Sequence, residues 1–187
     1  YDTDCSTAHS TISALCADAN WVDGTLRQGY TPFLDGAQTD ITLVGGIRGE
    51  MTSGISYDVS LGRGTNELRY TLNNTTAPSL GVAADGSFQR DFNLGGFDQE
   101  EVNFNADFSK SLSTDLNLAF GAEWREETFT TVAGGISAIN GNTSGMSSVK
   151  PADAGSFSRD NVALYVDLEH DMSDELLVQY AVRYEDF

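Results

Sequence analysis

The sequence predicts an all-β protein, an antiparallel up-and-down meander of about six strands arranged as three hairpins. Two observations carry this prediction. Apolar and polar residues alternate over stretches of roughly ten residues, and these stretches occur in pairs that short polar turns join and long polar segments separate. The 187 residues also include 19 Gly but only 3 Pro, a composition typical of strands and turns rather than of a Pro-rich linker between domains.

Residues 1–38 show no sustained alternation, and we expect a long loop there. Ile12, Leu15 and Ala19 recur at helical spacing, so this loop has room for a short helix that begins near Ser10.

Residues 39–72 are predicted to form hairpin one, in which Ile41 and Leu43 begin an alternation that resumes after the turn at 51–54. Beyond Gly62-Arg63-Gly64 the apolar residues change to the other phase, at Leu68, Tyr70 and Leu72. This change predicts either a β-bulge at the glycines or a strand that leaves the sheet.

The remaining chain repeats the design of strand, tight turn, strand and long loop. Residues 73–99 are a second long connection, residues 100–130 are hairpin two, and residues 131–157 are a third connection rich in Gly, Ser and Asn. Hairpin three spans residues 158–187, where two clearly alternating strands flank a polar turn at 170–175.

The charge of the chain excludes one class of partner. The net charge is -18, from 10 Lys and Arg against 28 Asp and Glu, whereas binding to nucleic acid requires clustered cations. No apolar run has the length of a membrane helix, and the N-terminal residues do not resemble a signal peptide. Neither observation argues against a β-barrel, whose strands are apolar only at every second position.

Two environments fit the apolar face of the hairpins, a bilayer and the core of a soluble β-sandwich. The short turns all fall at one end of the predicted sheet and the long loops at the other, which favours a membrane barrel. Charged residues also keep to the polar phase. Eight apolar residues of hairpin three are therefore predicted to face lipid: Val162, Leu164, Val166, Leu168, Val178, Tyr180, Val182 and Tyr184.

Four charged residues on the polar phase are the candidate lumen-facing residues: Arg48, Glu123, Arg125 and Arg183. One interpretation is that they hold a plug domain or line the path of a solute. The other is that they form ion pairs with one another on a water-exposed barrel wall.

Catalysis has little support, because His9 and His170 lie in segments at opposite ends of the predicted sheet. The adjacent carboxylates Glu100-Glu101 and Glu126-Glu127 fit solvated rim charges better than acid–base or Ca²⁺ chemistry, since neighbours on a strand point to opposite faces. We therefore predict no enzyme, no metal and no cofactor. Cys5 and Cys16 are either a short-loop disulfide of an oxidising compartment or two unrelated thiols.

The stretch SRDNVALYVDLEHDMSDELLVQYAVRYEDF resembles a mid-barrel hairpin of TonB-dependent outer-membrane receptors. Further matches to this family are GAQTDITLVGGIRGE, YTLNNTTAPSLG and LNLAFGAEWREETF, which occur in order from Gly36 onward. Residues 1–35 resemble the family only as a loop.

The resemblance implies part of a 22-stranded barrel in the outer membrane of a Gram-negative bacterium, with long extracellular loops. It implies import of a scarce nutrient, whether a siderophore, cobalamin, haem or an oligosaccharide. The implied partners are membrane lipid, the substrate, and TonB acting through a plug domain that we do not find in this chain. It also implies a disulfide between Cys5 and Cys16. We expect the chain to be a piece of a longer receptor.

The alternative hypothesis is a self-contained β-rich binding or adhesion module that oligomerises through exposed strand edges. An isolated six-stranded piece of a barrel is also predicted to oligomerise in water, because its edges and its apolar face are uncovered.

Overall fold

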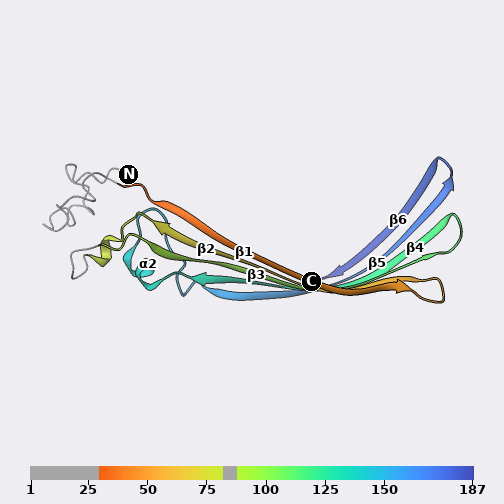
Figure 1. The fold of residues 1–187 in the computed structure, drawn as a ribbon, viewed down its shortest axis with the longest axis horizontal. Coiled ribbons are helices and arrows are strands. Elements are labelled where there is room, and N and C mark those ends of the chain that lie inside the picture. Colours follow the sequence, from red (N-terminus) through yellow and green to blue (C-terminus); the bar gives the residue numbers. More distant parts are fainter. Residues whose placement is uncertain (1–29, 82–87) are drawn as a thin grey trace. The chain divides into compact units, whose positions relative to one another are not determined.

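The computed structural model describes residues 30–81 and 88–187, and it confirms the predicted all-β meander. Its six strands form one sheet in the order of the chain, β1-β2-β3-β4-β5-β6 (Figure 1). The strands are β1 (Phe33–Glu50), β2 (Ser56–Asn73), β3 (Phe92–Ser111), β4 (Leu116–Ala133), β5 (Gly155–Ser173) and β6 (Leu176–Asp186). The predicted helix near Ser10 and the two cysteines lie outside the described residues.

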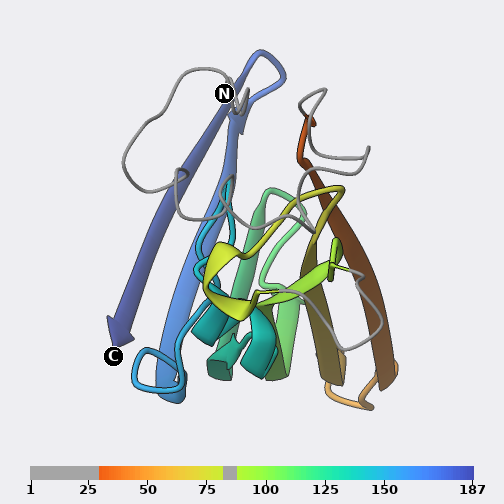
Figure 2. The same cartoon turned by 90° about the vertical axis from the view of Figure 1, so that its left-hand side faces the viewer.

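The connections are of two kinds. Tight turns join β1 to β2, β3 to β4 and β5 to β6, and the first is closed by Met51 N–H donating to Ile55 O at 2.8 Å. The long connections hold the 3₁₀ helix η2 (Pro78–Leu80) and the α-helix α2 (Ile136–Gly141), which pack against each other (Figure 2). The sequence pattern did not predict these helices. None of the described helices has the length and apolarity needed to cross a membrane.

The strands extend further than the alternating stretches predict. Strand β1 begins at Phe33, although residues 1–38 were expected to be loop, and β3 begins at Phe92 within the predicted connection 73–99. Strands β4 and β5 likewise extend into the connection predicted at 131–157. Backbone pairing continues in these extensions where the alternation of side chains has stopped.

The chain divides into two compact units. Unit 1 consists of Tyr1–Thr39, Glu67–Asp98 and Thr130–Gly155, and unit 2 consists of Asp40–Asn66, Gln99–Phe129 and Ser156–Phe187. The three tight turns belong to unit 2, where they lie at the same end (Figure 1). The long connections belong to unit 1.

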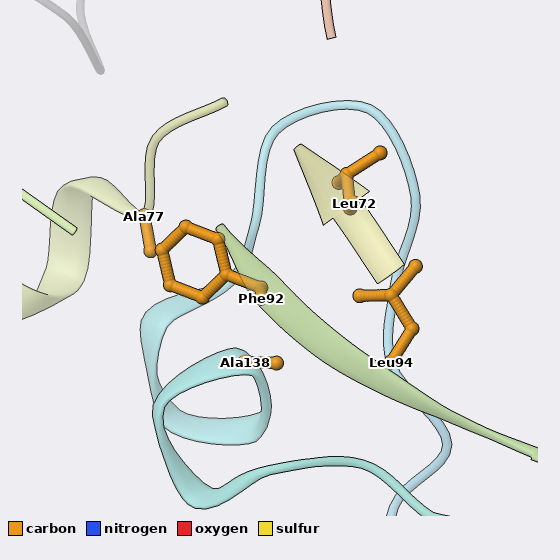
Figure 3. Close-up of a cluster of buried hydrophobic side chains, with 5 residues drawn as sticks. All are labelled: Leu72, Ala77, Phe92, Leu94 and Ala138. Atoms are coloured by element: carbon orange, nitrogen blue, oxygen red, sulfur yellow. The ribbon is translucent and has the colours of Figure 1, made fainter. Parts of the chain in front are cut away.

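Unit 1 has a small hydrophobic core. Leu72 comes from the end of β2, Phe92 and Leu94 from β3, Ala77 from the connection before η2, and Ala138 from α2 (Figure 3). Phe92 is only 1% exposed. The two long connections are therefore packed onto the strand ends and are not independent loops.

Hydrogen bonds from buried polar groups hold the connections of unit 1 together. Thr75, which is fully buried, donates its N–H to Arg90 O at 2.9 Å and its hydroxyl to Ser144 O. Val149 N–H donates to Leu94 O at 2.9 Å. A buried backbone group without a hydrogen-bond partner costs about 1–3 kcal/mol, so these bonds offset the free-energy cost of burying the connections.

The phase change along β2 has a cause that differs from both predicted ones. Two contacts between β1 and β2 lie on either side of Gly62-Arg63-Gly64: Asn66 on β2 donates to Asp40 on β1, and Gly46 on β1 lies close to Ser60 on β2. The two contacts are the same number of residues apart on β1 as on β2. The glycines therefore introduce no bulge between these two strands, and β2 continues unbroken to Asn73. Leu72 is instead buried in the core of unit 1. A buried position is apolar because it is buried, regardless of the face of the strand to which it belongs.

We predict that Phe92→Ala selectively loosens unit 1. Emptying a buried Phe site costs about 3–5 kcal/mol, and each 1.4 kcal/mol is roughly a tenfold change in an equilibrium. Hydrogen exchange at the amide of Val149, which bonds to Leu94 O, should accelerate at least about a hundredfold.

Ile136→Ala is the matched control, because Ile136 belongs to α2 but is 71% exposed. Equal acceleration in the two variants would show that burial in this core does not hold the connections.

Candidate functional site

The two faces of the sheet in unit 2 can be assigned from cross-strand contacts. Gly62 on β2 lies under Asn103 on β3, because a β-carbon at Gly62 would be 2.4 Å from Asn103 Oδ1. Asp107 on β3 accepts a 2.6 Å hydrogen bond from the Tyr165 hydroxyl on β5, and Tyr165 lies opposite Arg183 on β6. Even-numbered positions of β1 and β2 and odd-numbered positions of β3 to β6 therefore share one face, which we call face A. The opposite face is face B.

Face B carries the apolar residues that the alternation predicts. Strands β5 and β6 place all eight predicted lipid-facing residues on it, with Leu164 opposite Tyr184, Val166 opposite Val182, and Leu168 opposite Tyr180. Large apolar side chains of this face in unit 2 that are at least 40% exposed include Ile41, Leu43, Ile47, Leu61, Phe104, Val162, Leu164, Val166, Leu176, Tyr180, Val182 and Tyr184. An exposed apolar surface of this kind marks a site of contact with lipid or with another protein.

The apolar part of face B ends at charged residues on successive strands. These residues are Arg63 on β2, Glu100 on β3, Glu126 on β4, Asp160 on β5 and Asp186 on β6. Arg63 Nη2 donates to Glu100 Oε2 at 2.8 Å, and both side chains are largely exposed. The charges mark a border between an apolar belt and a polar strip on the same face.

Face A of unit 2 is charged and strongly acidic. Its cations are Arg48, Arg125, Arg159 and Arg183, and its carboxylates are Asp40, Glu50, Asp58, Glu101, Asp107, Glu123, Glu127, Asp167, Glu169 and Glu185. All four predicted lumen-facing residues therefore lie on this face.

Arg183 joins strands that are not neighbours. Its Nη2 donates to Glu123 Oε2 on β4 at 2.8 Å, and its Nε donates to Glu185 on its own strand. The bond to Glu123 crosses β5, whose Ala163 is fully buried and lies opposite Glu185. A small side chain at 163 leaves room for this crossing.

The other two predicted residues are placed differently. Arg125 approaches Glu123 at only 3.8 Å, and its buried Nε has no hydrogen-bond acceptor among the described residues. Arg48 lies apart from that group, in a recess of about 580 Å³ lined also by Asp58, Asp107 and Tyr165. The structure therefore brings Glu123, Arg125 and Arg183 together and leaves Arg48 in a second cluster.

A further recess, of about 310 Å³, was not predicted as a site. Its lining includes Glu127 and Phe129 on β4 and Phe157 and Arg159 on β5, and we call it the aromatic recess. Arg159 Nε donates to Glu127 Oε2 at 2.7 Å, and Arg159 Nη2 forms an ion pair with the same oxygen at 2.6 Å. Their shared odd-numbered phase was a signal in the sequence, but the pairing of β4 with β5 was needed to bring them together.

His9 lies outside the described residues, and within them the adjacent carboxylates do not converge on one site. Glu100 and Glu101 point to opposite faces, and Glu127 is engaged by Arg159. Within residues 30–81 and 88–187, no group of three or more His, Cys, Asp or Glu side chains is arranged to hold a metal ion.

A protein-family model matches nearly the whole chain. The model of the family described as "TonB dependent receptor-like, beta-barrel" matches residues 7–187, which is nearly the whole chain and extends further toward the N-terminus than the sequence resemblance. No curated protein matches the chain.

We predict that Ala163→Leu destabilises unit 2 by about 1–3 kcal/mol, the usual cost of overpacking a filled site. The larger side chain would occupy the space that the Arg183–Glu123 bond crosses. The measurement is the guanidinium midpoint of unfolding in detergent.

Val162→Leu, on the adjacent position of face B, should leave that midpoint nearly unchanged because Val162 is 44% exposed. If Leu were tolerated equally at both positions, a small residue at 163 would have no bearing on the ion pair.

Proposed function

The chain belongs to the β-barrel family of TonB-dependent receptors, which are outer-membrane transport receptors, and on that premise we propose that its six strands form part of the wall of such a barrel. In this proposal face B contacts lipid and face A faces the lumen. The long connections are extracellular, and the tight turns are periplasmic.

The observation that carries the proposal is the apolar belt on face B with its charged border. A soluble protein rarely leaves so many large apolar side chains exposed on one face, whereas a barrel strand in a bilayer requires it. The charged border fits the boundary between the hydrocarbon core of a bilayer and its head groups. It consists of Arg63, Glu100, Glu126, Asp160 and Asp186.

The width of the belt agrees with a bilayer. On β4 the apolar residues of face B run from Leu116 to Trp124, which is about 26 Å along a strand that rises roughly 3.3 Å per residue. A tilt of about 40° shortens this to roughly 20 Å across the membrane, close to the apolar band of about 25 Å in outer-membrane barrels.

Face A fits a wet interior. Its carboxylates and arginines would be costly against lipid, where an Arg near mid-membrane costs about 2–4 kcal/mol. The bonds of Arg183 with Glu123 and Glu185 compensate charges on the wall itself. For Arg183 and Glu123 these bonds favour mutual ion pairing over contact with a solute. Arg48 and Arg159, in contrast, line recesses that are large enough to hold part of a solute.

We infer that the parent receptor imports a scarce nutrient, with TonB delivering energy through a plug domain outside this chain. The packed connections of unit 1 would present the first surface that an incoming solute meets. This nutrient is a siderophore, cobalamin, haem or an oligosaccharide.

We predict that Val166→Arg prevents assembly of the receptor in the outer membrane. Val166 is 51% exposed on face B, within the apolar belt, and the substitution should cost about 2–4 kcal/mol of insertion free energy. The measurement is the amount of heat-modifiable receptor in the outer-membrane fraction.

Asp167→Asn is the control, because Asp167 is the next residue on β5 and belongs to face A, where it accepts a bond from Gln179. It should assemble normally. Normal assembly of Val166→Arg, or recovery of the wild type as a monodisperse water-soluble monomer, would favour the self-contained binding module instead.

A further inference from the structure

The aromatic recess combines a paired cation and carboxylate with exposed aromatic rings. The Arg159–Glu127 ion pair lies on face A, and two residues further along β4 and β5 stand Phe129 and Phe157. Phe157 is 71% exposed. An aromatic side chain this exposed on a polar face is a surface on which a flat ligand can stack.

Arg159 has an aromatic neighbour on its other side. Its Cζ lies 5.8 Å from the centre of the Phe187 ring, within the range of a cation–π contact. Glu127 Oε2 accepts the Arg159 Nε–H and lies close to Nη2, so the guanidinium is paired with a carboxylate and keeps further N–H donors for a ligand. Gln99, exposed on β3, adds an amide to the lining. The recess therefore offers apolar ring faces beside fixed donors and acceptors.

The charge of face A narrows the chemical class of the ligand. Carboxylates outnumber arginines on this face of unit 2, so a polyanionic solute is repelled by the wall. A neutral solute escapes that penalty. The ring of a sugar presents C–H groups on its face and hydroxyls on its rim, and each hydroxyl both donates and accepts a hydrogen bond.

We propose that the aromatic recess binds one ring of a neutral oligosaccharide. The sugar ring stacks on Phe157, and its rim hydroxyls bond to Glu127, Arg159 and Gln99. This inference rests on the proposed function, since it assumes that face A borders the path of an imported solute.

The test is calorimetric titration of the detergent-solubilised receptor with neutral hexasaccharides of glucose, xylose and mannose. At least one should bind. Phe157→Leu, which keeps an apolar side chain but removes the flat ring, should weaken binding at least tenfold, and so should Arg159→Ala. Phe157→Tyr keeps the ring and should stay within about threefold of the wild type.

Asp160→Asn is the matched control, because Asp160 adjoins Arg159 on β5 but belongs to face B. It should change the affinity less than twofold. Absence of binding to every hexasaccharide, or unchanged affinity in both Phe157→Leu and Arg159→Ala, overturns the inference. If the receptor still assembles in the outer membrane with heat-modifiable behaviour, the proposed function survives that result; failure to assemble would overturn the proposed function separately.

Discussion

The register of the six strands is the constraint on which the rest of the structure depends. Side chains alternate between faces with a period of two residues, so a slip of one residue would exchange face A for face B on a whole strand. Backbone pairing sets this register, as in the pairs of Leu164 with Tyr184 and Val166 with Val182. Side-chain contacts that only one register permits, such as Tyr165 with Asp107, reinforce it.

Small residues on face A make several of these contacts possible. A β-carbon at Gly121 would lie 2.5 Å from Cε1 of Tyr165, so the tyrosine ring can cover the strand only where a glycine stands. Ala163 has the same role beneath the bond between Arg183 and Glu123. Face A of unit 2 thus carries long side chains on some strands and small ones on their neighbours, and this complementarity helps to fix the register of the strands.

Unit 1 obeys a different rule from unit 2. In unit 2 the identity of most residues follows their face, because face B carries the apolar belt and face A carries most of the charges. In unit 1 the long connections bury Leu72, Phe92 and Leu94, so burial rather than phase decides which positions are apolar. Gly96 on β3 also lies close to the β2 backbone in this unit, since a β-carbon there would lie 1.9 Å from Leu68 O.

The sequence by itself indicated the antiparallel meander and its three tight turns, because short polar segments join paired alternating stretches, and it indicated the face of each alternating residue through the local period of two. It also placed Arg48, Glu123, Arg125 and Arg183 on the charged phase. Only the tertiary structure decided that Arg183 reaches Glu123 across β5, that Arg159 meets both Glu127 and Phe187, and that the connections pack into a core. Each of these contacts joins residues far apart in the chain. Their distances depend on the pairing of strands and on chain packing, which no period within a single strand encodes.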